Sequence, residues 1–176
     1  MTDSKYVVKI CLLGDASVGK TSLVYRFIEN RFRENYKSTL GVNLLKHDTD
    51  VEGYGRVSAQ IWDLGGQDSF KSLRNLYLEG ANGALVIFDV TKKKSFENLI
   101  EWITSFKGAR GDQPLILIGN KCDLKDQMKI KEKEAANFAK SYKMDLLLTS
   151  AKTGDNVENA FNDLIKKIVF QLFNKK

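Results

Sequence analysis

Histidine, proline and cysteine are scarce in this chain of 176 residues. The single histidine, His47, makes a histidine-ligated metal site close to impossible, because such sites usually use several imidazoles. The two cysteines, Cys11 and Cys122, lie far apart in apolar surroundings, so we expect no disulfide framework and infer a reducing compartment. The one proline, Pro114, belongs to no proline-rich linker.

Long hydrophobic runs are also missing. No segment approaches the roughly 18 apolar residues of a membrane-spanning helix. The first residues, MTDSKYVVKICLLG, have neither the basic region nor the cleavage site of a signal peptide. We therefore expect a cytoplasmic protein, with peripheral contact to membranes as an open alternative.

The overall composition is that of a folded chain, with 43% hydrophobic and 28% charged residues. Its length predicts a single domain over residues 1–176. The net charge of +6 is compatible with a phosphate ligand or an anionic lipid surface, but extra lysines on a solvated surface explain it as well. We expect no nucleic-acid partner.

Apolar runs alternate with helical patterns along most of the chain. Strands are expected at 6–14, 83–90, 114–120 and 145–150, a hairpin around the turn at 52–55, and helices at 19–30, 96–106, 131–142 and 157–168. This alternation predicts an α/β fold, a mostly parallel sheet with helices on both faces. The hairpin adds one antiparallel strand at an edge.

The segment GDASVGKT at 14–21 fits the phosphate-binding pattern G-x-x-x-x-G-K-[ST] and lies between an expected strand and an expected helix. Its glycines allow the backbone to wrap around an anion, Lys20 would neutralise phosphate oxygens, and the Thr21 hydroxyl would ligate Mg²⁺. The residues expected to bind phosphate are Asp15, Ala16, Ser17, Val18, Gly19, Lys20, Thr21 and Ser22.

The segment GNKCDL at 119–124 distinguishes guanine from adenine. The carboxylate of Asp123 can accept hydrogen bonds from guanine N1–H and its 2-amino group, which adenine does not offer. Alone, N-K-x-D is more often an exposed turn, but here it follows a strand and TSAK follows at 149–152. The residues expected around the base are Asn120, Lys121, Asp123, Leu124, Ser150, Ala151 and Lys152.

These segments, with WDLGGQ at 62–67, occur in the order and spacing of Ras-like small GTPases. The match covers residues 5–173 and is most similar to the Rab family. The segments that carry it are YKSTLGV, NLYLEGANGALVIFDVTKKKSFENLIEW and LIGNKCDL. The resemblance implies a P-loop three-layer sandwich with a six-stranded sheet and five helices, and GTP or GDP with Mg²⁺ as ligands.

The resemblance also implies roles for two loops that sense the third phosphate. In the first loop, Thr39 would join Thr21 on Mg²⁺, Phe32 would stack edge-on against guanine, and Tyr36 would close over the phosphates. Ordinary packing of both aromatic residues is the alternative.

In the second loop, Asp63 would hold Mg²⁺ through a water and Gly66 would donate its N–H to the γ-phosphate. Gln67 would position the attacking water. The expected catalytic residues are Gln67, Lys20 and Thr39, and the expected metal ligands are Thr21, Thr39 and Asp63.

The chain departs from the family pattern at several positions. Ala16 and Ser17 replace glycines of Ras proteins, and Gly65 replaces an alanine usual in Rab and Ras proteins. In the aromatic patch that binds effectors, Leu44 stands where Rab proteins have phenylalanine, while Trp62 and Tyr77 remain.

The leading interpretation is a GTP/GDP switch with slow intrinsic hydrolysis, acting in signalling or vesicle trafficking. An activating protein, an exchange factor and effectors are the expected partners, because the chain has no room for an inserted arginine-bearing domain. A nucleotide-binding interaction module that barely hydrolyses GTP and, more distantly, a P-loop kinase are the alternatives.

The end of the chain lacks the family's lipid attachment signal, since no cysteine follows Cys122. Its aromatic and basic residues, Phe170, Phe173, Lys175 and Lys176, are expected to finish a packed helix. Weak contact with an anionic membrane is the alternative.

Overall fold

The computed structural model describes residues 6–33, 39, 41–66 and 68–175, with the side chains of 68–70 left out of the description. Tyr36, Gln67 and Lys176 therefore lie outside the described residues.

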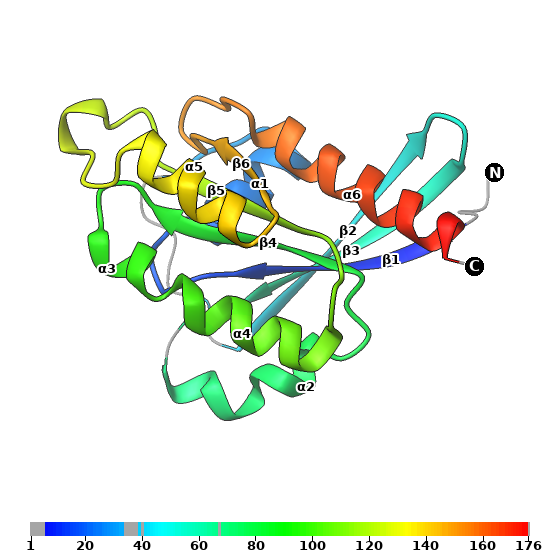
Figure 1. The fold of residues 1–176 in the computed structure, drawn as a ribbon. Helices are drawn as coiled ribbons and strands as arrows, with labels where there is room; N and C mark the ends of the chain where they lie inside the picture. The colour runs from blue at the N-terminus through cyan, green and yellow to red at the C-terminus, as the bar shows by residue number, and fades with distance from the viewer. Residues whose placement is uncertain (1–5, 34–38, 40, 67, 176) are drawn as a thin grey trace.

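A six-stranded sheet forms the centre of the fold (Figure 1). The strand order is β2-β3-β1-β4-β5-β6; β2 runs antiparallel to β3, and the other neighbours are parallel. The strands are β1 (Tyr6–Leu13), β2 (Val42–Val51), β3 (Gly55–Leu64), β4 (Gly83–Asp89), β5 (Leu115–Asn120) and β6 (Asp145–Leu148). The expected antiparallel edge strand and the mostly parallel sheet are confirmed. Every residue of β4 and β5 is buried, as continuous apolar runs predict for strands covered on both faces.

Helices cover both faces of this sheet (Figure 1). They are α1 (Lys20–Glu29), α2 (Arg74–Leu78), α3 (Lys93–Glu97), α4 (Leu99–Arg110), α5 (Glu132–Ser141) and α6 (Val157–Asn174), with short 3-10 turns η1 (Asp68–Leu73) and η2 (Lys125–Gln127). Only Asn98 separates α3 from α4, so these two make the single helical stretch expected there, and the five-helix expectation holds.

Two apolar cores lie on opposite faces of the sheet. Residues of α1 and α6, such as Leu23 and Phe161, pack with one face. Residues of α2, α4 and α5, such as Leu78, Trp102 and Ala135, pack with the other. Because helices cover both faces, the accessible parts of the sheet are the loops that follow the parallel strands. These loops lie at the carboxyl ends of the strands, where ligands bind in open α/β folds.

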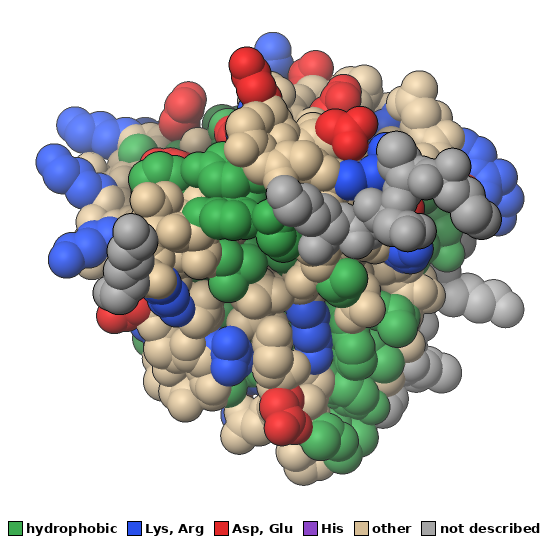
Figure 2. Space-filling model, turned by 90° about the vertical axis from the view of Figure 1, so that its right-hand side faces the viewer, with side chains coloured by type: hydrophobic (Ala, Val, Ile, Leu, Met, Phe, Trp, Pro, Cys, Tyr) green, Lys and Arg blue, Asp and Glu red, His purple; other side chains and the backbone are tan. Residues whose placement is uncertain are grey.

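The start of β1 and the end of α6 lie at the opposite end of the sheet (Figure 1), and Figure 2 shows that hydrophobic side chains are exposed on this side of the molecule. There, the Phe173 ring packs on Tyr6 and Tyr54 at centroid distances of 4.9 and 5.0 Å, while Phe170 is 60% exposed. The end of α6 is thus packed through one of its two aromatic residues. Among the described helices, none combines the length and apolarity needed to cross a membrane.

Candidate functional site

The loop between β1 and α1 encloses the ammonium group of Lys20. Lys20 Nζ donates to the carbonyl oxygens of Gly14 and Asp15, both at 2.8 Å, and the side chain is buried. Burial lowers the pKa of Lys20 to about 8, although the carboxylates of Asp63 and Asp15 oppose that shift. A phosphate in this loop would offset the lost hydration of the ammonium.

Gly19 in this loop has no room for a side chain. Its φ is +100°, and a Cβ atom there would lie 2.3 Å from Asn120 Nδ2. The glycine therefore lets the phosphate loop and the base-side loop touch, in addition to adopting a backbone conformation that other residues disfavour.

Three oxygen-bearing side chains from separate elements meet beside Lys20. Thr21 Oγ1 donates to Asp63 Oδ2 at 2.5 Å and lies 2.7 Å from Thr39 Oγ1, which in turn lies 3.3 Å from the same carboxylate oxygen. These are the expected metal ligands, contributed by the start of α1, the loop before β2, and the end of β3.

The residues of this cluster fit a hard divalent cation. Asp63 is buried, and its Oδ1 has no hydrogen-bond partner among the described residues. Burial raises the pKa of Asp63, while the Thr21 hydroxyl and the Lys20 charge act against the increase. A cation, or a water that it binds, would satisfy the orphaned oxygen and stabilise the carboxylate. The oxygen donors are those that Mg²⁺ prefers.

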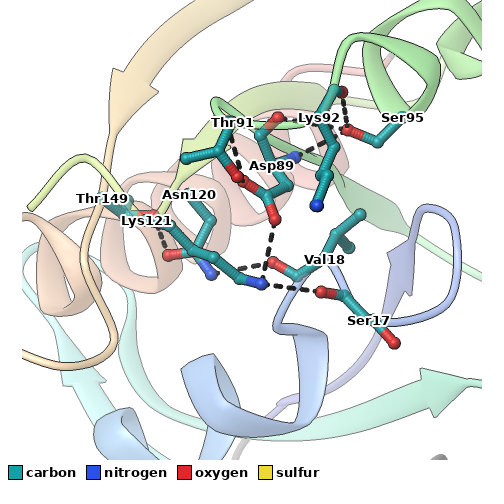
Figure 3. A network of polar contacts seen from close by, with 9 residues as sticks. All are labelled: Ser17, Val18, Asp89, Thr91, Lys92, Ser95, Asn120, Lys121 and Thr149. Carbon is teal, nitrogen blue, oxygen red and sulfur yellow. Dashed lines mark hydrogen bonds and ion pairs between the residues drawn. The ribbon is translucent and has the colours of Figure 1, made fainter. Parts of the chain in front are cut away.

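The carboxamide of Asn120 joins three loops on the base side (Figure 3). Its Nδ2 donates to the carbonyl of Val18 at 3.0 Å, and its Oδ1 accepts from Thr149 Oγ1 at 3.0 Å. Asn120, Val18 and Thr149 are all buried. The end of β5, the phosphate loop and the loop after β6 are thereby held in one arrangement.

A buried carboxylate, Asp89, holds Lys121 in place (Figure 3). Lys121 Nζ lies 2.9 Å from Asp89 Oδ2 and also donates to the carbonyl of Ser17 at 2.9 Å. Asp89 Oδ1 accepts from the backbone N–H and hydroxyl of Thr91 at 2.8 and 2.6 Å. Asp89 was not predicted as a site residue from the sequence, although its place at the carboxyl end of a buried strand was a usable signal.

The loop after β6 is fastened to both Asp123 and α1. Ser150 Oγ donates to Asp123 Oδ1 at 2.7 Å. Arg26 donates from Nε to the carbonyl of Ala151 at 2.7 Å and from a terminal nitrogen to that of Lys152 at 2.6 Å. Arg26 was not anticipated, because nothing in its local sequence points to a loop 125 residues away.

The remaining expected base-side and loop residues differ in burial. Ser22, Phe32 and Leu124 are half-buried, whereas Ala16, Ser17 and Lys152 are exposed. Phe32 packs against the core that contains α1 and α6.

The backbone after β3 lies directly on the phosphate loop. A Cβ atom on Gly66 would be 2.3 Å from the Ala16 nitrogen and 2.4 Å from the Asp15 carbonyl carbon. The Gly65 N–H donates to the carbonyl of Gly41 at 2.7 Å. Gly66 thus lies close to the phosphate loop, and its expected contact with a phosphate stays a prediction.

One described cavity lies elsewhere. It has a volume of about 1060 Å³ and lies at the opposite edge of the sheet, between α6, the β2–β3 turn and the start of β5. No residue of the phosphate loop or of the base-side loops lines it. This cavity is therefore separate from the candidate nucleotide site.

A phosphate loop with a buried lysine, followed at the same sheet edge by oxygen ligands and an Asn-Lys-x-Asp loop, defines a P-loop nucleotide-binding protein. Comparison with known proteins makes this specific. A model described as the Ras family matches residues 9–170.

Individual Rab proteins also match most of the chain. The chain is 37% identical over 167 residues to Ras-related protein Rab-13 of Canis lupus familiaris, covering 94% of this chain and 82% of that protein. It is 42% identical over 164 residues to Ras-related protein RABA1a of Arabidopsis thaliana, covering 93% and 76%. It is 36% identical over 171 residues to human Ras-related protein Rab-8B, covering 97% and 82%. The chain belongs to the Ras family, as a Rab-like small GTPase that binds guanine nucleotides.

Proposed function

We propose that the chain is a guanine-nucleotide switch that binds GTP and GDP together with Mg²⁺ and hydrolyses GTP slowly. The observation that carries the proposal is the meeting of Thr21, Thr39 and Asp63 oxygens within 2.5–3.3 Å of one another beside a buried lysine. These atoms come from three segments, one of which precedes β2 in the loop expected to sense the third phosphate.

The phosphate loop supplies the positive environment for the reaction. Its backbone N–H groups and Lys20 would bind the phosphates and stabilise charge that develops on them. Thr21, Thr39 and Asp63 would hold Mg²⁺, which would supply positive charge to neutralise the phosphates. Thr39 would be held in place while the γ-phosphate is bound, and its loop would be released when that phosphate leaves.

Guanine recognition rests on Asp123. Its Oδ1 accepts from Ser150, yet each carboxylate oxygen has two acceptor sites, so both oxygens remain capable of binding the N1–H and 2-amino groups. The Lys121 stem would lie over the base, held by Asp89 and Ser17.

Slow hydrolysis and dependence on an activating protein are part of the proposal. Gln67 would orient water, but charge on the transferring phosphoryl group is commonly stabilised by an arginine supplied by a partner. We therefore expect the isolated chain to turn over slowly and an activating protein to accelerate it.

Partner binding in signalling or vesicle trafficking is a further part of the proposal, supported by the Rab-like sequence. Leu44 is 55% exposed and lies opposite Trp62 in the β2–β3 register. The Tyr77 ring lies 6.4 Å from that of Trp62. Hydrophobic and aromatic side chains grouped in this way suit the centre of a protein interface, where effectors would bind.

The test combines nucleotide identification with turnover. Nucleotide extracted from the purified protein should be GDP or GTP, and phosphate release from added GTP should continue beyond one turnover. Gln67→Leu should reduce the rate, whereas Gln113→Leu, a matched change at the far edge of the sheet, should not. Release of an adenine nucleotide would refute the proposal, and tight guanine binding without phosphate release would favour the interaction module.

A further inference from the structure

The carboxylate of Asp15, although in the phosphate loop, is bonded to the helical stretch that begins with α3. Asp15 Oδ2 accepts from Asn98 Nδ2 at 2.6 Å, and Oδ1 accepts from Trp102 Nε1 at 2.9 Å. The carbonyl of the same residue accepts from Lys20 Nζ at 2.8 Å. Asp15 thus connects the lysine that would bind phosphate to two side chains 83 and 87 residues away.

The indole of Trp102 has a second partner, Arg74. The Arg74 guanidinium carbon lies 3.6 Å from the ring centroid, and both residues are buried. Arg74 also contacts Glu101 Oε1 at 3.6 Å and Ser105 Oγ at 3.4 Å on the same helix. A cation on the ring face draws electron density from the indole and so strengthens N–H donation to the Asp15 carboxylate.

Arg74 is the first residue of α2, just beyond the segment expected to sense the γ-phosphate. Lys71 in η1 contacts the same Glu101 carboxylate oxygen at 2.5 Å, so η1 and α2 are both anchored on α4. A continuous series of contacts therefore runs from α2 through the indole to the phosphate loop.

We propose that Trp102 is a positioning residue that couples α2 to the phosphate loop, so that nucleotide release depends on the Arg74–Trp102 stack. This inference rests on the proposed nucleotide site. Contact of α2 with α4 holds the indole, the indole holds Asp15, and Asp15 holds the loop that binds phosphate. Displacement of α2 would weaken this support and speed nucleotide release.

Trp102→Phe separates the two contacts of the indole, because it keeps a ring under Arg74 and removes the N–H that Asp15 accepts. Loss of one hydrogen bond to a charged group predicts GDP dissociation about 10-fold faster than wild type, equivalent to about 1.4 kcal/mol. The matched control is Ile100→Ala, an exposed position on the same helix, which should change the rate less than about twofold.

Coupling between Arg74 and Asp15 distinguishes a positioning role of Trp102 from a merely structural one. Arg74→Met and Asp15→Asn should each speed GDP dissociation, but together they should fall at least about threefold short of the product of the single effects. In the Trp102→Phe background the two effects should multiply. Leu76→Ala is the control on α2, since its side chain is 62% exposed.

Two results would overturn the inference. One is multiplication of the Arg74 and Asp15 effects in the wild-type background. The other is coupling that persists without the indole N–H, which would indicate direct charge interaction through space. The cycle needs only Arg74→Met, Asp15→Asn and their combination, so multiplication of the two effects would still overturn the inference if Trp102→Phe folds poorly.

Amide hydrogen exchange of the nucleotide-free protein separates this inference from the proposed function. Trp102→Phe and Arg74→Met should each increase exchange of the amides of residues 15–19, and Ile100→Ala should not. If wild-type protein retained no guanine nucleotide, the proposed function would fail while this comparison still tested the coupling. Unchanged exchange in both variants would refute the coupling.

Discussion

Replacing Asp89 with asparagine tests how the base-side loop is held. The substitution keeps an oxygen that can accept from Thr91, but it removes the negative charge facing Lys121 and presents an amide N–H₂ to the ammonium. Because Lys121 is expected to cover one face of the guanine, Asp89→Asn should speed GDP dissociation although Asp89 is not expected to touch the nucleotide.

The magnitude follows from the burial of the two partners. A hydrogen bond to a charged group contributes about 1.5–3 kcal/mol. The Asp89 side chain is 2% exposed, but that of Lys121 is 35% exposed and keeps its bond to the Ser17 carbonyl, so solvent and the second partner reduce the loss. We expect about 1–2 kcal/mol, which corresponds to GDP dissociation about 5- to 30-fold faster.

The assay is displacement of a fluorescent GDP analogue, arranged as a double-mutant cycle with Lys121→Met. If the ion pair is the cause, Asp89→Asn should have little further effect once Lys121 is replaced. Asp126→Asn, at an exposed position in η2, controls for loss of a nearby negative charge. GDP dissociation at the wild-type rate in Asp89→Asn, with acceleration in Lys121→Met, would show that Asp89 does not hold Lys121 for binding.

Two further predictions follow from shifted pKa values. Burial lowers the pKa of His47 below 6.5, although Asp48 and Glu158 oppose the shift, so the unfolded chain binds a proton at higher pH than the folded chain. The free energy of unfolding should therefore fall as pH drops below 6.5. Urea unfolding at several pH values should show a weaker pH dependence in His47→Gln than in wild type. An equal slope of unfolding free energy against pH in the two proteins would contradict this prediction. Burial raises the pKa of Cys11 to about 12, so an alkylating reagent at pH 8 should modify Cys122 alone in the native protein and both thiols in urea. Labelling of Cys11 in the native protein, located by mass spectrometry, would contradict the protection of this thiol by burial.

Much of the fold could be predicted because its signals are local. Strands buried on both faces have continuous apolar sequences, and the functional motifs follow these strands directly, so their meeting at one edge follows from parallel topology. The break between α3 and α4 was not predicted. Ser95 in α3 accepts a hydrogen bond from the Asp89 backbone N–H at 3.0 Å, which fixes this short helix to the end of β4, and periodicity carries no record of such a contact.

The parts of the site that escaped prediction depend on pairs distant in sequence. Arg26 meets the loop after β6, and Trp102 meets the phosphate loop, only because the sheet brings their elements together. An arginine or tryptophan in an amphipathic helix has an ordinary packing role in most proteins, so its residue type alone does not indicate a site. Motif residues could be predicted because the ligand fixes their spacing in the sequence. Their supporting residues are brought to the site by the fold, so no sequence spacing indicates them.

The adjacent glycines Gly65 and Gly66 allow a final prediction about the switch itself. The three atoms nearest to a Cβ on Gly66 would be backbone atoms of the phosphate loop, at 2.3–2.6 Å, and backbone cannot rotate aside as a side chain can. Gly66→Ala must therefore lift the segment after β3 by roughly an ångström. Only GTP has a third phosphate for the Gly66 N–H to reach, so the affinity for a GTP analogue should fall relative to that for GDP.

Gly65→Ala is the matched comparison, because the contact of Gly65 with Gly41 is made by its backbone N–H, which alanine retains. Isothermal titration with both nucleotides should show the affinity ratio reduced in Gly66→Ala and nearly unchanged in Gly65→Ala. Equal reduction in both variants would mean that flexibility of the glycine pair matters more than the close approach of Gly66. An unchanged ratio in Gly66→Ala would mean that the segment after β3 leaves the phosphate loop whenever nucleotide binds.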